Sequence, residues 1–382
     1  MPSKTPYYIG LMSGTSLDGI DGVLLSFTGK KINLIKHAEI AYPKALQQAF
    51  FALFTPANNE IERSQLAGII RAELAAQLVD TLCCDIDRSQ VRAIADHGQT
   101  VRHCPNVAPP YSVQIHQGAR LAELSSITTV VDFRSKDIAS GGQGAPLVPA
   151  FHQAFFSCQK QHRLIVNIGG ICNISLLKPN DTQALFGFDT GPGNTLMDIW
   201  ATQHINKAYD HHGNWACSGE VNTALLAHFM EDDYFMRTPP KSTGREHFNL
   251  AWLTDKLATF KSRNKGPLEA NDVQASLTAL TAHSLTLGIA QACAQADIDP
   301  HKDLDGLYIC GGGAFNACLM TALKTQTELA VRSTEALGIA PKLVEAAAFA
   351  WLGAQSIGQN PISLSRATGA VHPNILGAIY PA

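Results

Sequence analysis

The chain has 382 residues, of which 46% are hydrophobic and 16% charged, with a formal net charge of −3. This length exceeds the usual size of one hydrophobic core, so two lobes are expected. No Lys/Arg block stands out. We therefore expect no nucleic-acid or membrane-surface partner, because phosphate-rich partners select concentrated basic patches.

The cysteines and the first residues point to a cytoplasmic protein. The nine cysteines are odd in number, include the adjacent Cys83 and Cys84, and form no C-x-x-C pair. Reduced thiols are therefore expected. The N-terminal sequence has no apolar run of signal-peptide length, and no apolar stretch reaches the ~20 residues of a membrane helix.

The first part of the chain predicts the elements of an α/β lobe. Strands are predicted for 7–12, 20–27 and 32–42, and helices for 45–54 and 61–82, from their apolar spacing. Two further strands, in VRAIADHGQT and ITTVVDFR, end in polar residues. In α/β proteins, sites are built just beyond the carboxyl ends of strands.

The pattern restarts after the glycine-rich stretch DIASGGQGAPLVPAFHQAFF, which we interpret as a crossing between lobes. RLIVNIGGICNISLL predicts two strands joined by a Gly-Gly turn, and LFGFDTGPGNTLMDIWA predicts a strand, a loop and a helix. Helices follow at 221–229, 250–260 and 273–296. A strand that ends in glycines is then predicted in LDGLYICGGGAFN, and a helix in NACLMTALK. The last strand is predicted in LAVRSTEALGI, and the last long helix in KLVEAAAFAWLGAQSI.

Both halves thus open with a strand, a glycine-containing turn and another strand, which is a weak internal duplication. We expect an α/β fold of two lobes with a cleft between them. Residues 1–150 together with 360–382 are predicted to form the first lobe, and residues 151–359 the second.

The first loop, SGTSLDGID, could bind an anion. Backbone N–H groups in a Gly14-Thr15-Ser16 turn can form a concave anion site. Asp18 or Asp21 would suit Mg²⁺, which prefers carboxylates and water. The alternative is a plain hairpin, because Asp-Gly is itself a strong turn signal.

Two glycine motifs in the second half could approach the same ligand. Gly169-Gly170 is the counterpart of the first loop, and two such hairpins facing each other could hold a polyphosphate. Gly311, Gly312 and Gly313 follow a strand and permit close backbone approach. They do not fit the dinucleotide pattern G-x-G-x-x-G. Close packing of helix on strand explains the triple glycine equally well.

The motif FDTGPGN offers a candidate general base. Asp189 is predicted at a strand end, before a sharp turn formed by Gly191, Pro192 and Gly193. A carboxylate held rigidly at such a place can accept a proton in catalysis. The alternative is a helix N-cap, a position that Asn194 fills more naturally.

DHGQT and DFR supply further polar candidates. Arg134 carries a fork of donors that suits a carboxylate. His97 and Gln99 suit sugar hydroxyls or amides, although a structural role is expected for His97.

Together these motifs resemble the anhydro-N-acetylmuramic acid kinases, a family of the actin-like ATPase and sugar kinase superfamily. The resemblance rests on GLMSGTSLDGIDGVLL, DHGQT, DFR, NIGGICNI, FDTGPGN, GGGAFN and STEALGI, in the family's order along the whole chain. It implies two actin-like, ribonuclease H-like lobes with a nucleotide cleft between them.

The resemblance also implies a set of site residues and cofactors. Bound ATP and Mg²⁺ are implied, with the adenosine near the triple glycine. Asp18 stays the candidate metal ligand from the first loop, and Ile9 stands where the wider superfamily usually has Asp. The nucleotide-binding residues implied are Gly14, Thr15, Ser16, Leu17, Asp18, Gly19, Ile20, Asp21, Gly169, Gly170, Gly311, Gly312 and Gly313. Asp189 matches the catalytic base, and Gln99, Arg134 and Glu335 fall in segments that line the sugar pocket.

The implied substrate is an amino sugar, 1,6-anhydro-N-acetylmuramic acid, recycled from the cell wall, and the implied product is N-acetylmuramic acid 6-phosphate. A cytoplasmic homodimer is also implied. The chemistry agrees: O6 of the anhydro sugar is tied to C1, so water must open the ring while the freed oxygen takes the phosphate. The alternatives are another sugar hydroxyl kinase, a glycosidase, which needs a second catalytic carboxylate, or a non-catalytic actin-like ATP switch.

Overall fold

A computed structural model describes residues 5–14, 16–179, 184–239, 241–244, 247–264 and 266–382. The chain divides into two compact units. The first contains Met1–Phe156 and Leu343–Ala382, and the second contains Ser157–Lys342. The chain therefore leaves the first unit once and returns to it near its C-terminus.

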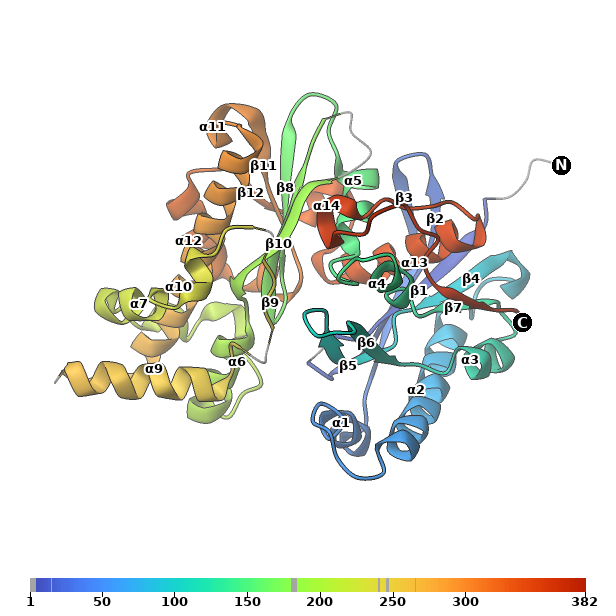
Figure 1. Cartoon of the computed structure of the whole chain (residues 1–382), viewed down its shortest axis with the longest axis horizontal. Coiled ribbons are helices and arrows are strands. Elements are labelled where there is room, and N and C mark those ends of the chain that lie inside the picture. The colour runs from blue at the N-terminus through green and yellow to red at the C-terminus, as the bar shows by residue number, and fades with distance from the viewer. Residues whose placement is uncertain (1–4, 15, 180–183, 240, 245–246, 265) are drawn as a thin grey trace. The chain divides into compact units, whose positions relative to one another are not determined.

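The first unit is built on a six-stranded sheet with the order β13-β7-β4-β1-β2-β3 (Figure 1). β1, β2 and β3 are antiparallel neighbours, β1, β4 and β7 are parallel, and β13 is antiparallel to β7 at the edge. A separate two-stranded ribbon pairs β5 with β6. The strands are β1 (Tyr7–Met12), β2 (Gly19–Thr28), β3 (Lys31–Ala41), β4 (Val91–Asp96), β5 (Gln99–Cys104), β6 (Tyr111–Ile115), β7 (Thr129–Val131) and β13 (Ala378–Tyr380).

Helices cover both faces of this sheet. Side chains that alternate along β1 and β4 divide into two clusters, one with Ile9 and Ile94 and the other with Ala93 and Ala95. The first cluster packs under α1, α2 and α3, and the second under α5 and α13. These helices are α1 (Lys44–Phe51), α2 (Glu60–Leu82), α3 (Gly118–Ser125), α5 (Val148–Phe156) and α13 (Val344–Ile357); the short α4 (Ser135–Ala139) and α14 (Ser365–Thr368) complete the unit.

The close approach of α13 to the sheet depends on small residues. A Cβ atom at Gly10 would lie 1.9 Å from the carbonyl oxygen of Ala346, and one at Gly353 would lie 2.6 Å from the Cβ of Ala95. Real Cβ atoms do not approach backbone oxygen so closely, because the van der Waals radii overlap. Gly10, the first glycine of the N-terminal motif, is therefore required by packing.

The second unit repeats the topology of the first. Its sheet has the order β10-β9-β8-β11-β12, with β8, β9 and β10 antiparallel and β8, β11 and β12 parallel. The order and the directions of these five strands are the same as those of β3-β2-β1-β4-β7 in the first unit. The duplication predicted from the sequence is therefore confirmed at the level of topology. The strands are β8 (His162–Ile168), β9 (Ile171–Leu177), β10 (Ala184–Pro192), β11 (Leu304–Cys310) and β12 (Val331–Ser333).

The core of the second unit lies between its sheet and a group of helices around α10. Leu277, Leu280 and Leu285 of this helix are buried against Ile168 and Ile309 in one cluster. Because Gly288 has no side chain, α10 can approach β10 closely at this position. A Cβ there would lie 2.4 Å from Cγ2 of Thr190. The helices are α6 (Thr195–Ile205), α7 (Thr223–Met230), α8 (Asp233–Met236), α9 (Leu250–Arg263), α10 (Ala270–Ala296), α11 (Pro300–Asp303) and α12 (Ala317–Thr327).

The observed elements differ from the predicted ones in several places. The stretch VRAIADHGQT is not one strand, because the chain turns at Gly98, where φ is +76°, and Gln99 begins β5. The last strand is β13 and not the one in LAVRSTEALGI. The glycine-rich stretch after Asp137 stays within the first unit, where the Gly144 N–H and Thr368 Oγ1 both donate to the Asp137 carboxylate at 2.8 Å.

The unit boundaries also differ from the expected lobes. The first unit extends to Phe156 and includes Leu343–Ala382, whereas the sequence placed 151–359 together. The physical reason is α13, whose apolar residues pack on β1 and β4. No helix in the described part of the chain is long and apolar enough to span a membrane. All nine cysteines are free thiols.

Candidate active site

The predicted site motifs follow the parallel strands of the two sheets. The first loop follows β1, DHGQT follows β4 and Arg134 follows β7. In the second unit Gly169-Gly170 follows β8, the triple glycine follows β11 and Glu335 follows β12. Since parallel strands end at the same edge of a sheet, each unit gathers its three motifs at one edge. The motifs therefore occupy equivalent places in the two units.

The first loop is a turn anchored by a buried leucine. The Leu17 N–H donates to the Gly14 carbonyl at 3.4 Å, and Leu17 has a φ of +63° with its side chain in the core beside Ile20. Ser16 and Asp18 are exposed on this turn. Thr15, which the sequence analysis assigned to the nucleotide, lies outside the described residues. The hairpin is confirmed by the antiparallel pairing of β1 with β2, and the anion site stays a prediction.

Gly19, Ile20 and Asp21 belong to β2 and not to the loop. A Cβ at Gly19 would lie 2.2 Å from the carbonyl oxygen of Ile40 on β3, so strand pairing requires this glycine. Ile20 is a core residue, and Asp21 pairs in register with Met12. Among the described residues of the predicted nucleotide segment, the exposed ones are therefore Ser16 and Asp18.

A buried polar network supports the base of this loop. The Arg71 guanidinium donates to both carboxylate oxygens of Asp96 at 2.7 Å, to Ser13 Oγ at 3.1 Å and to the Tyr42 hydroxyl at 3.0 Å. Arg71, Asp96 and Ser13 are each exposed by 2% or less. Burial opposes the ionisation of Asp96, yet the Arg71 charge and its hydrogen bonds hold the pKa of Asp96 below its usual value. The network joins α2, the end of β1 and the end of β4.

Gln99 connects the first loop with the DHGQT segment. Its side-chain Nε2 donates to the carbonyl oxygens of Gly14, at 3.1 Å, and Thr100, at 3.3 Å. Its Oε1 is buried and has no hydrogen-bond partner among the described residues. A buried acceptor without a donor is costly, so this oxygen is suited to a ligand N–H or O–H group.

His97 orients Arg134. The imidazole Nδ1 donates to the Gly98 carbonyl at 3.0 Å, which leaves Nε2 to accept from Arg134 Nη2 at 2.8 Å. Burial, followed by the Arg134 charge, holds the pKa of His97 well below its usual value, so the ring is neutral. Arg134 Nη1 donates to the Gly144 carbonyl at 2.6 Å. Burial lowers the pKa of Arg134 to about 10, which leaves it charged near neutral pH.

The turn after β8 is fixed by the chain that leads into α6. The Gly169 carbonyl accepts from Asn194 N–H at 2.8 Å, and the Gly170 carbonyl accepts from Gly193 N–H at 2.9 Å. A Cβ at Gly193 would lie 2.3 Å from the Gly169 oxygen, so this contact needs glycine. The motifs NIGGICNI and FDTGPGN therefore meet.

The triple glycine packs on the end of the same strand. Gly311 has a φ of +80°, and a Cβ there would lie 2.5 Å from Asn167 Oδ1; a Cβ at Gly313 would lie 2.1 Å from Cγ2 of Ile168. Packing thus accounts for Gly311 and Gly313. At Gly312 the nearest atom to a Cβ is Asn194 Nδ2 at 3.6 Å, an ordinary contact. The motifs NIGGICNI, FDTGPGN and GGGAFN are therefore in contact at the end of β8.

Asp189 lies within β10 and not at its end, because the strand continues to Pro192. A bulge follows Asp189: Asp189 pairs with Asn173 and Gly191 with Cys172, so Thr190 is the extra residue. The Thr243 N–H donates to Asp189 Oδ2 at 3.1 Å. The bulge and this donor, rather than a strand end, set the direction of the carboxylate.

Asp189 is not a helix N-cap. α6 begins at Thr195 with Asn194 in the N-cap position, as predicted. However, the Asn194 side chain makes no capping hydrogen bond, and its Nδ2 donates instead to the Ile168 carbonyl at 3.3 Å. Asn194 therefore joins α6 to the β8 turn.

Glu335 is exposed on a single 3₁₀ turn, Thr334–Leu337, directly after β12. Ser333 Oγ donates to its Oε2 at 3.4 Å. Because β12 runs parallel to β11, Glu335 and the triple glycine follow neighbouring strands at the same edge of the sheet.

The residues that support the site were not among the predicted ones. Arg71 could have been found, because it is a charged residue in the middle of the buried stripe of α2. The polar stretch KSTG begins at Lys241 and contributes Thr243. It was not predicted as part of the site, although it lies between two predicted helices. Tyr234, whose hydroxyl donates to the Asp189 carbonyl, has no local sequence signal.

Two units of repeated topology, each with a glycine-containing turn after its first strand, define a two-lobed α/β protein. Comparison with known sequences gives the family. The family model for anhydro-N-acetylmuramic acid kinase matches residues 6–382, so the chain belongs to this family. It is therefore a sugar kinase, and the family supports the use of ATP.

Individual relatives agree along the whole chain. Proteins named anhydro-N-acetylmuramic acid kinase from Nitrosomonas europaea and Cupriavidus pinatubonensis are each 45% identical to it, over 379 and 386 residues. The alignments cover 98% and 100% of this chain and all of each relative. Among solved structures, a ROK family glucokinase from Streptomyces griseus in complex with glucose and AMPPNP is a distant match: 10% identical, TM-score 0.39, covering 91% of this chain and 98% of that one.

Proposed function

We propose that this kinase opens 1,6-anhydro-N-acetylmuramic acid with water and phosphorylates O6 at the expense of ATP. The products are N-acetylmuramic acid 6-phosphate and ADP, and the role is the recycling of cell-wall peptidoglycan. The observation that carries the proposal is Asp189, a carboxylate held by a backbone donor in a chain that matches the family over residues 6–382.

Asp189 is the proposed general base. It accepts a proton from a water molecule, whose oxygen bonds to C1 of the sugar as the bond between C1 and O6 breaks. The freed O6 bonds to the γ-phosphorus, and the bond from that phosphorus to the β-γ bridging oxygen breaks, which releases ADP. The Thr243 N–H on Oδ2 favours the ionised carboxylate that this step requires.

The glycine motifs are proposed to hold ATP. Ser16 and Gly14 offer accessible polar groups on the first loop, and Gly312 is the member of the triple glycine that packing does not require. Asp18 is the proposed carboxylate for Mg²⁺. In the described residues no group of three or more His, Cys, Asp or Glu could hold a metal. One exposed carboxylate nevertheless fits Mg²⁺ that arrives with nucleotide phosphates and keeps most of its water ligands.

The sugar side is proposed to involve Gln99, Arg134 and Glu335. Arg134 is the candidate partner for the lactyl carboxylate, because its guanidinium is held in place by His97 and Gly144. Gln99 Oε1 is the candidate acceptor for a sugar hydroxyl or the acetamido N–H. On the family resemblance we further propose a homodimer that acts in the cytoplasm, where ATP is available.

The test replaces Asp189 with Asn, which keeps an oxygen that can accept the Thr243 N–H but is not basic. We expect turnover of Asp189→Asn to fall by at least ~10²-fold, while ATP binding in calorimetry is retained. Asp297→Asn, which changes an exposed carboxylate in the same unit, should keep full turnover. Normal turnover of Asp189→Asn would remove Asp189 from the mechanism.

Water labelled with ¹⁸O separates the proposal from its alternatives. If water attacks C1, the label enters the anomeric hydroxyl and none enters the phosphate. Label in the phosphate would indicate an ATPase with uncoupled sugar chemistry. Phosphorylation of ordinary sugars without any opening of the anhydro bond would identify a hydroxyl kinase, and ATP binding without sugar-dependent ADP release would identify a switch protein.

A further inference from the structure

Asp189 lies on β10, which is an edge strand of its sheet. The backbone groups of an edge strand that point away from the sheet lack ladder partners and must be satisfied in another way. At Asp189 the N–H donates to the Lys241 carbonyl at 3.1 Å, and the carbonyl accepts from the Tyr234 hydroxyl at 2.7 Å. A side-chain hydroxyl therefore takes the place of a neighbouring strand's N–H group.

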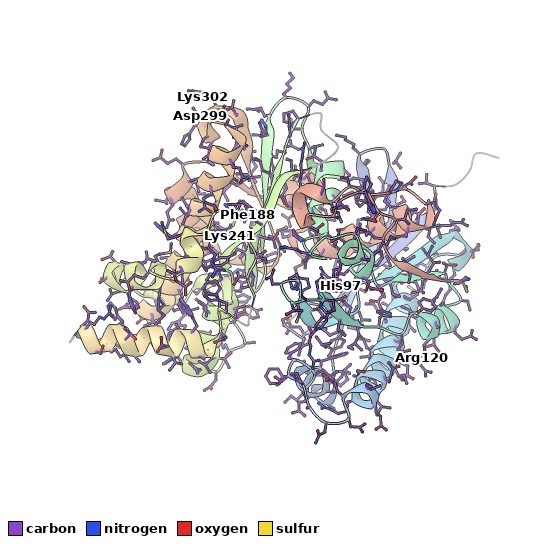
Figure 2. The ribbon with its side chains drawn as sticks, in the orientation of Figure 1. His97, Arg120, Phe188, Lys241, Asp299 and Lys302 are labelled. Atoms are coloured by element: carbon purple, nitrogen blue, oxygen red, sulfur yellow. The ribbon has the colours of Figure 1, made fainter. Side chains whose placement is uncertain are left out.

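The same region contacts the Asp189 side chain. Thr243, two residues after Lys241, donates its N–H to Oδ2. Lys241 lies near Phe188, the residue before Asp189, in the side-chain view (Figure 2). The peptide unit and the carboxylate of Asp189 are thus both fixed from one side, by Tyr234, Lys241 and Thr243.

Tyr234 is itself held rigidly. It is fully buried, and its ring meets Phe235 and Phe248 edge to face with centroid separations of 6.1 and 5.7 Å. Its N–H donates to Asp232 Oδ1 at 3.0 Å. The other oxygen of Asp232 accepts from Trp252 Nε1 at 2.8 Å and from His247 Nε2 at 3.1 Å. The hydroxyl can therefore move little relative to the sheet.

We propose that Tyr234 is a positioning residue for the general base. Its hydroxyl fixes the Asp189 peptide directly before the bulge at Thr190, and the peptide sets the direction of the carboxylate. The inference rests on the proposed role of Asp189. Because Tyr234 is fully buried and its hydroxyl donates to the Asp189 carbonyl, its effect on catalysis is proposed to pass through Asp189.

A positioning role predicts a change in kcat without a change in binding. Alignment of the base with the attacking water matters in the transition state, and a displacement of about 1 Å can cost up to ~10²-fold in rate. The affinity for ATP and sugar should not change, because the buried Tyr234 hydroxyl already donates to the Asp189 carbonyl. A purely structural role would instead lower thermal stability and leave the kcat of the folded enzyme unchanged.

The experiment compares Tyr234→Phe with Tyr308→Phe in the full-length enzyme. Tyr308 is a matched control, because it is also buried in the second unit and its hydroxyl donates at 2.6 Å to an aspartate, Asp305. We expect Tyr234→Phe to lower kcat about 10-fold or more, with the KM values for ATP and sugar within twofold of the wild type. Tyr308→Phe should keep kcat within twofold.

Replacement of Tyr234 by p-aminophenylalanine restores a donor at the same place and should recover most of the lost kcat. This variant also serves if Tyr234→Phe does not accumulate as folded protein. An unchanged kcat in Tyr234→Phe, or no difference in kcat between the amino and phenyl side chains, would overturn the proposal. Asp189→Asn in the same assay distinguishes failure of the positioning role of Tyr234 from failure of the general-base role of Asp189. An active Asp189→Asn enzyme would refute the general-base role.

Discussion

Gly14 and Gly19 belong to the same motif but differ in the room around them. Within the described part of the chain, the nearest atom to a Cβ at Gly14 would be Ser16 Oγ at 3.5 Å, an ordinary contact, whereas a Cβ at Gly19 would lie 2.2 Å from a backbone oxygen. Substitution at Gly14 can therefore report on a ligand with little effect on the fold. Substitution at Gly19 cannot, because it disturbs the pairing of β2 with β3.

We expect Gly14→Val to bind ATP at least about tenfold more weakly than the wild type, because the added side chain occupies the space that the phosphates approach. A tenfold loss corresponds to about 1.4 kcal/mol. Isothermal calorimetry measures the affinity, and thermal melting tests that the fold is intact. Unchanged affinity in a folded Gly14→Val protein would show that the first loop does not contact the nucleotide.

His152 predicts how stability depends on pH. This residue of α5 is 1% exposed, and burial lowers its pKa to about 3. In the unfolded chain its pKa returns to about 6.5. As the pH falls, the unfolded state therefore binds this proton at a higher pH than the folded state does. The free energy of unfolding consequently falls as the pH drops below 6.5. By pH 5 the loss from this residue amounts to about 2 kcal/mol.

Urea unfolding at pH 7 and pH 5 measures this dependence. In His152→Phe, which keeps a ring beside Phe156 but cannot titrate, the fall between the two pH values should be smaller by about that amount. An equal fall in both proteins would show that His152 takes up its proton in the folded state. His97, which burial and Arg134 also keep neutral, contributes a fall of the same sign to both proteins.

At the scale of elements, the contact between α13 and the sheet depends on Gly10. We expect Gly10→Ala to lower the free energy of unfolding by about 3 kcal/mol, because the new methyl group forces α13 away from β1. Gly266→Ala is the control, since among the described residues, its chain neighbours aside, no atom lies within 4 Å of a Cβ there, and its effect should stay within about 0.5 kcal/mol. Equal stabilities of the two variants would show that α13 moves freely.

The elements show what the sequence could predict and what it could not. β1 was predicted to the residue and α2 to within one, because apolar period and glycine position are local properties of the chain. The break at Gly98 was missed because a two-residue turn between β4 and β5 interrupts a pattern that otherwise continues. The place of α13 in the first unit was missed because it depends on a contact with β1, more than 300 positions away in the chain.

The same distinction applies to the site. Asp189, Gln99 and Arg134 could be selected as candidates because each falls in a short polar motif in or next to a predicted strand. The pairings that support them could not be predicted, because the Arg71–Asp96 pair and the Tyr234–Asp189 hydrogen bond join positions 25 and 45 residues apart. Such pairings follow from the tertiary fold and leave no periodic signal.

At the scale of the whole molecule, one topology has been used twice with different loops. The turn after β1 is long and polar and contains an exposed aspartate, whereas the turn after β8 contains two glycines and is hydrogen-bonded to the start of α6. The buried Arg71 network supports the first turn, and backbone hydrogen bonds support the second. The two units therefore share their strand order, while the loops at the carboxyl ends of their parallel strands carry different polar groups.

The division of the first unit between two distant segments has a consequence for biosynthesis. A ribosome makes β1 and β4 early, but α13, which covers one face of their sheet, emerges only after the whole of Ser157–Lys342. The second unit can thus reach its native state while the first still exposes Ala93, Ala95 and their neighbours. During this interval the nascent chain presents an apolar surface to the translation machinery and its chaperones, and the arrival of the last forty residues closes it.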